Sequence, residues 1–298
     1  MNTDYSSCNT EAHERCPLIK RVCPMCDGND WRVHFVYSEP PPLETRFSMT
    51  ARKPYWRELH RCGQCGHFLE RFDCDQNDLY EREYVSAVYG DADGIKRTFD
   101  RINALPPEKS DNIGRVHLVD VYCRQYWSRL GLPVAADQLK LLDVGAGLGV
   151  FPFRMKSAGW NCVTIDMDRR LVDHHRSVIG LEAHVADVTT VAGLGQFDLV
   201  TFNKVLEHVE EPVAMLAGVA RLLMPHGLIY VELPDGEVAA TIGKEREEFL
   251  LGHRHVFSFA SFSLMVRKAG FELRTCERLC EPSGKFTLRG FARSKASA

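Results

Sequence analysis

The most constraining feature of the chain is the segment LLDVGAGLGVFPF, residues 141–153, which places a glycine at every second position between two apolar runs. This pattern predicts a buried strand that turns tightly into a helix, because glycine enters the left-handed backbone region without steric strain. From residue 137 onward, strand-like runs alternate with helical stretches, which predicts a parallel sheet with helices on both faces. The runs are LKLLDVGA, NCVTIDMD, EAHVADV, FDLVTFNKV and LIYVELPD. The glycines then lie at the carboxyl ends of the strands, where such sheets bind ligands.

Near its end the chain carries two strand-like runs around EPSGK, within FELRTCERLCEPSGKFTLRGFA. A short loop that contains glycine between two such runs is typical of an antiparallel hairpin. We therefore expect a hairpin at one edge of the parallel sheet.

Two CxxC pairs dominate the N-terminal part of the chain, which we divide into a flexible leader over residues 1–20 and a zinc-binding module over residues 21–78. Four thiolates form a closed tetrahedral zinc site with a structural role. The gap between the pairs exceeds the ~15–20 residues of a zinc ribbon, so we expect an insertion. A metal-free cluster of buried thiols is the competing interpretation. The predicted ligands are Cys23, Cys26, Cys62 and Cys65, with Cys74 as an alternative ligand.

Residues 79–136 show a helical pattern, which we interpret as a bridge or lid before the larger domain of residues 137–298. The clearest helix begins after Ser110, a favourable N-cap residue, and ends at Gly131 and Pro133. Apolar residues at helical spacing predict one buried face. They are Ile113, Val116, Val119, Cys123, Trp127 and Leu130.

Composition narrows the class of protein. A formal charge of -3 and a pI near 6.5, with no block of like charge, do not favour a nucleic-acid partner. No apolar window approaches the ~18 residues that cross a bilayer, and the polar start does not resemble a signal peptide. Eleven cysteines are an odd number, and four form CxxC pairs, which indicates reduced thiols that bind metal. We expect a cytoplasmic protein with a small-molecule substrate and no membrane partner, and we leave the oligomeric state open.

The glycine-rich turn departs from two common nucleotide-binding motifs. A nicotinamide or flavin site needs GxGxxG, but Val150 stands where the last glycine is required. A P-loop needs a lysine followed by serine or threonine, and this segment has neither. Instead, Asp143 precedes a GxGxG set.

With these motifs in order, residues 137–291 resemble the class I S-adenosylmethionine-dependent methyltransferases. The resemblance implies an α/β fold, a Rossmann-like doubly wound sheet of seven strands with a C-terminal antiparallel hairpin. It also implies methyl transfer with S-adenosyl-L-methionine as the cofactor. The motifs that carry it are LLDVGAGLG, TIDMD, the AD of residues 186–187, FDLVTFNKVLEHVEEP, LLMPHGLIYVELPD and the terminal hairpin.

The resemblance also implies a cofactor site. Glycines let the backbone approach the methionine part of the cofactor, while Asp143 supports the loop and helps hold the ammonium. Asp166 is placed to accept both ribose hydroxyls, and Asp187 matches the acid near the adenine amino group. A helix cap is the competing interpretation of both acids. The implied set is Asp143, Gly145, Ala146, Gly147, Gly149, Asp166, Met167, Asp187 and Asn203.

Methyl transfer to a hydroxyl or a carbon acid requires a base. The resemblance places Glu207 and His208, from VLEHVEEP, above the sulfonium. His253 and His255 resemble a second histidine element, although Gly252 replaces its expected glutamate. We leave open which of the three histidines is the base, with Glu207 as its orienting partner.

Related acids and a histidine accompany a metal in the ubiquinone-type O-methyltransferase branch. In this chain Asn203 and Lys204 replace the earlier acid, so we predict no catalytic metal. The segment of residues 235–259 is polar, and we expect it to form a lid over the pocket. Within it, Lys244, Arg246 and Arg254 are candidate phosphate contacts, although a charge run such as GKEREE is also typical of a solvated helix face.

A four-cysteine module joined to this kind of domain resembles bacterial methyltransferases that modify sugars. By analogy we expect transfer to a hydroxyl or carbon of a sugar-containing small molecule, either a nucleotide-linked sugar or a surface-polysaccharide unit. The alternatives are a natural-product O- or N-methyltransferase, a tRNA or protein methyltransferase, and a non-catalytic scaffold that binds the cofactor.

Overall fold

The computed structural model describes residues 22–45, 47, 55–72, 84–132, 135 and 138–295. Its larger sheet has seven strands in the order β10-β11-β8-β7-β4-β5-β6. Strands β8, β7, β4, β5 and β6 run parallel, whereas β11 and β10 are antiparallel neighbours at the edge, so the predicted hairpin and fold class are confirmed. The strands are β4 (Lys140–Val144), β5 (Asn161–Asp166), β6 (Glu182–Val185), β7 (Phe197–Asn203), β8 (Leu223–Pro234), β10 (Phe271–Cys280) and β11 (Phe286–Ser294).

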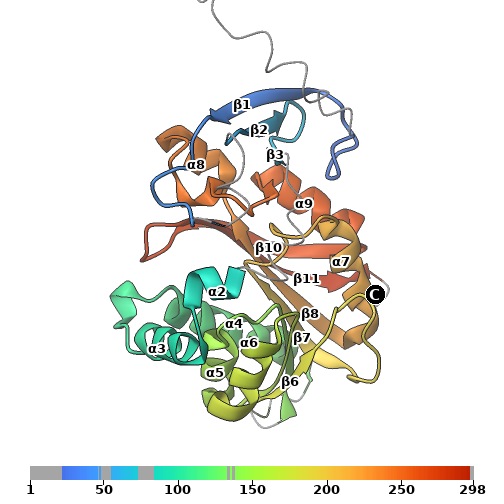
Figure 1. The fold of residues 1–298 in the computed structure, drawn as a ribbon. Coiled ribbons are helices and arrows are strands. Elements are labelled where there is room, and N and C mark those ends of the chain that lie inside the picture. Colours follow the sequence, from blue (N-terminus) through green and yellow to red (C-terminus); the bar gives the residue numbers. More distant parts are fainter. Residues whose placement is uncertain are drawn as a thin grey trace, which may run out of the picture.

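Helices cover both faces of this sheet (Figure 1). The α3–α6 group lies on one face, and α7 and α9 lie on the other, which is the arrangement that right-handed crossovers between parallel strands produce. The helical elements are α2 (Tyr84–Tyr89), α3 (Ala92–Asn103), η3 (Pro107–Lys109), α4 (Asp111–Arg129), α5 (Val150–Ser157), α6 (Arg169–His174), η5 (His175–Ile179), α7 (Pro212–Gly218), η6 (Val219–Leu222), α8 (Gly236–Ile242), η7 (Glu247–Phe249) and α9 (Phe259–Lys268).

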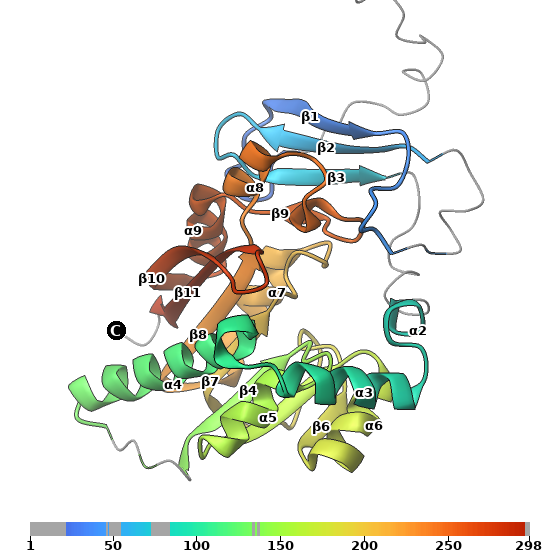
Figure 2. The ribbon, with the colours of Figure 1, turned by 90° about the vertical axis from the view of Figure 1, so that its left-hand side faces the viewer.

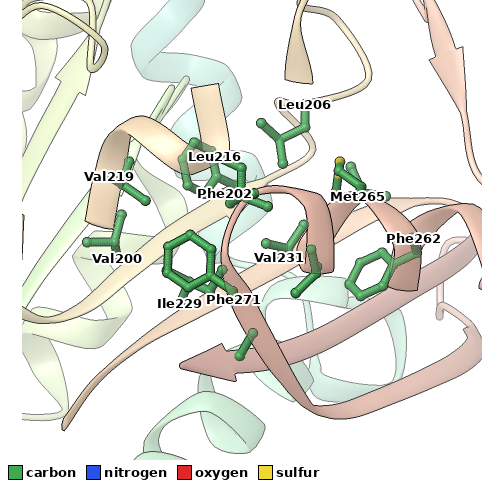
Figure 3. Close-up of a cluster of buried hydrophobic side chains, with 14 of the residues drawn as sticks. Val200, Phe202, Leu206, Leu216, Val219, Ile229, Val231, Phe262, Met265 and Phe271 are labelled. Carbon is green, nitrogen blue, oxygen red and sulfur yellow. The ribbon is translucent and has the colours of Figure 1, made fainter. Parts of the chain in front are cut away.

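The central strands are buried on both sides, and their sequences are almost continuously apolar for this reason. On the face of α7 and α9, Leu216 and Met265 pack against Phe202 and Val231 (Figure 3). On the opposite face, helices α4 and α5 bury a second cluster against the same strands. This rigid layer holds the carboxyl ends of β4, β5 and β7 in place, where the glycine-rich turn and its neighbours lie.

The N-terminal region forms a separate antiparallel sheet in the order β1-β2-β3-β9. Its strands are β1 (Trp31–Tyr37), β2 (Arg57–Cys62), β3 (Phe68–Phe72) and β9 (His255–Val256). Figure 2 shows this sheet close to α8 and α9, on the far side of the molecule from α3 and α5. Its last strand comes from the C-terminal half of the chain, so the sheet of the predicted module is completed by residues of the predicted methyltransferase domain.

The structure places the polar segment of residues 235–259 partly in the interior, whereas its role as a lid stays a prediction. This segment forms α8, η7 and β9, and Phe249 is fully buried in a cluster with Phe68 of β3 and Ala239 of α8. Arg246 is held by Glu248 at 2.8 Å, and Nζ of Lys244 donates to the carbonyl of Val36. Lys244 is exposed and Arg246 is partly buried, and both cations make contacts within the protein.

The bridge helix is α4, and Oγ of Ser110 accepts a hydrogen bond from the amide of Ile113 at 3.3 Å, as its N-cap role predicts. Val119 and Trp127 are buried, but Leu130 is 46% exposed because it follows the end of the helix. The predicted leader and Cys74 lie outside the described residues. Among the described helices, none combines the length and apolar character needed to span a bilayer.

Candidate active site and cysteine cluster

The glycine-rich turn after β4 has the backbone conformation that its sequence predicts. Gly145, Gly147 and Gly149 have φ values of 62°, 54° and 74°, in the left-handed region. A Cβ on Gly145 would lie 2.9 Å from Val205, and one on Gly149 would lie 2.9 Å from the His175 ring. A Cβ on Gly147 would meet nothing within 4 Å. Gly145 and Gly149 therefore allow tight internal packing, whereas Gly147 borders open space that a ligand can enter.

Asp166, at the end of β5, supports this turn. One carboxylate oxygen accepts from the amide of Gly147 at 2.9 Å, and the other accepts from the amide of Asp168 at 3.0 Å. Each carboxylate oxygen has two lone pairs, so both can accept a further hydrogen bond. Burial raises the pKa of Asp166. The adjacent Met167 side chain is 62% exposed and is free to cover an adenine ring.

Asp143 is buried beneath the turn. Its Oδ1 accepts from Oγ1 of Thr201 at 2.6 Å and from Nδ2 of Asn203 at 2.9 Å, so its observed role is to tie β4 to β7. Burial raises the pKa of Asp143 to about 7. The other amide atom of Asn203, Oδ1, is buried and has no hydrogen-bond partner among the described residues. A ligand ammonium beside the turn would satisfy this acceptor, a side-chain role that was not predicted for Asn203.

Two further residues complete this part of the site. Oδ1 of Asp187 accepts from the amide and the hydroxyl of Thr189, both at 2.8 Å, so this acid caps the turn after β6. His175 bridges the Gly147 carbonyl at 2.7 Å and the Thr164 hydroxyl at 2.9 Å. Burial lowers the pKa of His175 to about 4, so the ring is neutral. No local sequence pattern distinguishes His175, because its role depends on the packing of α6 and η5 against the turn.

After β7 the chain brings an acid and two histidines together. Nδ1 of His208 donates to the carbonyl of Gly252 at 2.9 Å, and Nδ1 of His253 donates to the carbonyl of Glu248 at 2.8 Å. The two ring centroids lie 5.0 Å apart. A carbonyl only accepts, so both protons lie on Nδ1 and both Nε2 atoms carry a lone pair. Burial lowers the pKa of His208 to about 4 and that of His253 to about 3.

Glu207 lies in the same cluster. Its carboxylate is fully buried, and neither oxygen has a hydrogen-bond partner within the described ranges. The predicted hydrogen bond that would orient His208 is thus not made by Glu207, and the carbonyl of Gly252 takes this role. Burial raises the pKa of Glu207 to about 8. An uncompensated buried acid needs a proton or an incoming partner.

Ligand atoms of Glu207, His208 and His253 lie within 4.8 Å of one another, which is close enough to hold a metal ion. Lys204 opposes this use, because its ammonium acts on Glu207 from nearby and an added cation would be repelled. Its backbone has a φ of 60°, and its Nζ donates to the hydroxyl of Thr287 at 2.7 Å. A non-glycine residue in the left-handed region is uncommon and is often found at functional sites.

His255 is placed differently from the other two histidines. Its Nδ1 lies 2.9 Å from Nε2 of His67, and its Nε2 lies 3.3 Å from the carbonyl of Glu210. Both ring nitrogens of His255 are therefore within hydrogen-bonding distance of other groups, at the start of strand β9 of the N-terminal sheet. The His255 ring is therefore not part of the side-chain cluster of Glu207, His208 and His253, although the His255 amide donates to the Glu207 carbonyl at 3.1 Å.

A buried ion pair beside this cluster was not predicted from the sequence. Arg115 of α4 makes two hydrogen bonds to Glu232 of β8, one of them at 2.6 Å, and the Tyr230 hydroxyl donates to the same carboxylate at 2.8 Å. Burial alone would raise the pKa of Glu232, but Arg115 and Lys204 outweigh it and hold the value at about 2. The pair joins the bridge helix to the carboxyl end of a central strand. Spacing could not reveal it because 117 residues separate the partners.

The two CxxC pairs meet in the N-terminal sheet. Sγ of Cys23 lies 3.6 Å from Sγ of Cys65, and Sγ of Cys26 lies 3.6 Å from Sγ of Cys62. All four sulfurs lie within 4.8 Å of one another. Sulfurs around a tetrahedral zinc ion, with Zn–S near ~2.3 Å, are about 3.8 Å apart. The four thiols therefore fit the predicted ion without rearrangement.

Comparison with known proteins agrees with this geometry. A family model described as a methyltransferase domain matches residues 95–275. The chain belongs to this methyltransferase family. A ubiquinone biosynthesis O-methyltransferase of Xanthomonas campestris pv. campestris strain B100 is 30% identical over 215 residues, which cover 67% of this chain and 82% of that protein. The predicted class, an S-adenosylmethionine-dependent methyltransferase, is confirmed.

Two solved methyltransferase structures share the fold. The magnesium protoporphyrin IX methyltransferase of Synechocystis PCC 6803, with bound SAH, has a TM-score of 0.52 at 17% identity and covers 74% of this chain and 100% of its own. The 1,6-didemethyltoxoflavin N1-methyltransferase of Burkholderia thailandensis has a TM-score of 0.51 at 17% identity and covers 78% and 96%. At this identity the likeness concerns the fold, so the acceptor of our methyltransferase must be argued from its own residues.

Proposed function

We propose that this methyltransferase transfers a methyl group to a hydroxyl or carbon of a sugar-containing small molecule, with His208 as the base. The observation that carries the proposal is the pair of imidazoles, His208 and His253, whose Nδ1 protons are held by main-chain carbonyls. This arrangement puts the lone pair of each ring on Nε2, and His208 lies in the segment that follows β7. A base with its proton-accepting nitrogen preset is what deprotonation of a hydroxyl requires.

The cofactor would lie on the glycine-rich turn. Gly147 borders open space, Asp166 has lone pairs for ribose hydroxyls, and Oδ1 of Asn203 needs a donor. Gly145, Ala146 and Gly149 shape the turn. Met167 and Asp187 would border the adenine, and Asp143 would fix the loop from beneath. When bound, S-adenosylmethionine supplies an already activated methyl group, so the chain's task is to orient the acceptor and take its proton.

The polarity of the acceptor side supports a hydroxyl-rich acceptor. Glu207, His208 and Lys204 follow β7, and Glu232 and Arg115 lie beside them. A site rich in hydrogen-bonding groups favours a substrate with matching hydroxyls, since an apolar substrate would leave those groups unpaired. The cysteine module next to this side is a further resemblance to sugar methyltransferases. Zn²⁺ held by Cys23, Cys26, Cys62 and Cys65 would give that module its fold.

A second candidate is methylation of a phenolic or amine group in a natural product. The Xanthomonas relatives carry the name ubiquinone biosynthesis O-methyltransferase, which favours an aromatic hydroxyl. The same histidine pair could deprotonate a phenol. The two candidate functions therefore differ in the acceptor molecule and share the same base.

The test is methyl transfer from isotope-labelled S-adenosylmethionine to panels of nucleotide-linked sugars, aromatic hydroxyls and amines, with products read by mass spectrometry. We expect a labelled sugar product and a loss of about 10²–10⁴-fold in kcat for His208→Ala. His226→Asn is the matched control, because His226 is exposed at the amino end of β8 and has a φ of 64° that Asn tolerates. A labelled aromatic or amine product alone would select the second candidate. Cofactor binding without turnover on any panel would support a scaffold, and methyl transfer to RNA or protein in a parallel assay would overturn both candidates.

A further inference from the structure

A cavity of about 450 Å³ lies on the N-terminal sheet, outside the site described above. The cysteine knuckle of residues 62–66 forms one wall, and the starts of α8 and α9 form another. No residue of the glycine-rich turn or of the histidine cluster lines it. The other lining side chains are Arg32, His34, Arg61, Gln64, Glu237 and Ala260.

Two like charges face each other in this cavity. Arg32 of β1 and Arg61 of β2 are cross-strand partners in the antiparallel pair, and both line the cavity. Directly opposed like charges destabilise a sheet unless a counter-charge lies between them. The Asp30 carboxylate lies 3.2 Å from the Arg32 guanidinium and balances the charge of Arg32 only. The Arg32 side chain is 77% exposed.

Arg61 lacks such compensation. Its Nε is buried without a hydrogen-bond partner, and the described part of the chain supplies no carboxylate within ion-pair distance. Its guanidinium lies 5.5 Å from the centroid of the Phe68 ring, which holds it in place over an apolar surface. A partly buried guanidinium with an unsatisfied N–H is costly, and an anionic acceptor would remove this cost.

The remaining wall favours an anion. Among the described residues that line the cavity, Glu237 is the one acid, and Arg278 at 2.6 Å and the amide of Phe259 at 3.1 Å already neutralise it. Ala260 lies in the first turn of α9, a helix of 10 residues, where the helix dipole is positive. Gln64 adds a side-chain amide beside the knuckle. Positive charge and donors therefore predominate.

We propose that this cavity binds the phosphoryl group of a small molecule, as a monophosphate or diphosphate, between Arg32 and Arg61. Guanidinium groups favour phosphate because their planar donors match two phosphate oxygens. The volume accommodates a diphosphate with part of the group attached to it. The competing explanation is that Arg61 only balances the negative charge of the neighbouring thiolates, in which case no anion binds.

The test is isothermal titration of the full-length, metal-loaded protein with inorganic phosphate, pyrophosphate and uridine diphosphate at constant ionic strength. We expect saturable heat with at least one of the three compounds. The compound with the highest affinity shows whether the cavity prefers a free anion or a phosphate ester. Arg61→Gln should weaken binding by at least about tenfold, and Arg32→Gln should weaken it in the same direction. Arg267→Gln is the matched control, because Arg267 is exposed on α9 and lies outside the cavity.

Three results would overturn the proposal: no saturable heat with the wild-type protein, unchanged binding in both cavity variants, or equal weakening by Arg267→Gln. Because Arg32 is 77% exposed, Arg32→Gln remains folded even where Arg61→Gln is destabilised. Zinc content and the melting temperature of each variant check this. The inference stands apart from methyl transfer, so binding of S-adenosylhomocysteine should be equal in all variants.

Discussion

The carbonyl oxygen of Gly252 lies 2.9 Å from Nδ1 of His208, and this contact determines which ring nitrogen carries the proton. We predict that His208 is present as the Nδ1–H tautomer and stays neutral from pH 8 to pH 5.5, because burial lowers its pKa to about 4. Long-range proton–nitrogen NMR on ¹⁵N-histidine protein measures the tautomer, and His208→Ala assigns the signal. An Nε2–H tautomer, or a charge change within that pH range, would contradict the base assignment.

Gly147 should be required for the ligand and not for the fold. Gly147 and Gly131 have φ values of 54° and 70°, and a Cβ on either meets nothing within 4 Å. Alanine at each position should therefore cost about 1 kcal/mol of unfolding free energy from backbone strain. Only Gly147→Ala should also lose affinity for S-adenosylhomocysteine, by more than about tenfold in a calorimetric titration. Equal affinities in the two variants would remove Gly147 from the cofactor site.

Glu207 should make stability depend on pH. Its folded pKa of about 8 is above the ordinary 4.5, so between these values the folded protein holds a proton that the unfolded chain has released. The unfolding free energy should therefore fall as pH rises from 4.5 to 8, with a slope of up to about 1.4 kcal/mol per pH unit from this group. Glu207→Gln should remove this contribution in urea titrations at several pH values. Glu211→Gln, an exposed change in the same loop, should leave the slope unaltered.

The ion pair of Arg115 with Glu232 should contribute more to the unfolding free energy than the ion pair of Arg124 with Asp120, which lies on the same helix. Arg115→Met leaves a fully buried carboxylate without its main partner, which should cost about 3–5 kcal/mol. Arg124→Met, which breaks a partly exposed pair with Asp120 at 2.7 Å, should cost less than about 1 kcal/mol. Urea unfolding measures both. Similar losses would show that the Glu232 carboxylate is solvated or has another partner.

Removal of metal should unfold the N-terminal sheet and loosen β9 with it. The hydroxyl of Ser258 donates to the carbonyl of Cys65, and β3 pairs with β9, so the knuckle is joined directly to the segment that carries His253 and His255. A chelator with a thiol-blocking reagent should release one zinc ion per chain, detected colorimetrically. Hydrogen exchange should then increase in residues 255–257 and stay slow in β4. Absence of released zinc from denatured protein would leave the metal-free thiol cluster as the correct interpretation.

Local patterns were sufficient for the framework of the fold. Strand-like runs, the turn at EPSGK and the N-cap at Ser110 each depend on neighbours in the sequence, and each appears in the structure where expected. The partial burial of residues 235–259 was not predicted, because it depends on contacts with the distant strands β1–β3. A polar sequence becomes interior when its partners, such as the carbonyl groups and acids near Arg246, are supplied by the fold.

The sequence by itself determined the methyltransferase class, the glycine-rich turn and the four cysteines, because each depends on short spacings that carry their own stereochemistry. Only the tertiary structure decided how the remaining polar groups are used. In the tertiary structure His208 is hydrogen-bonded to the carbonyl of Gly252, and His255 is hydrogen-bonded to His67. Arg115 forms an ion pair with Glu232, whereas Arg61 has no acidic partner among the described residues. These relationships join residues far apart in the chain, and a buried charge or ring nitrogen acquires its role only from the atoms that the fold places beside it.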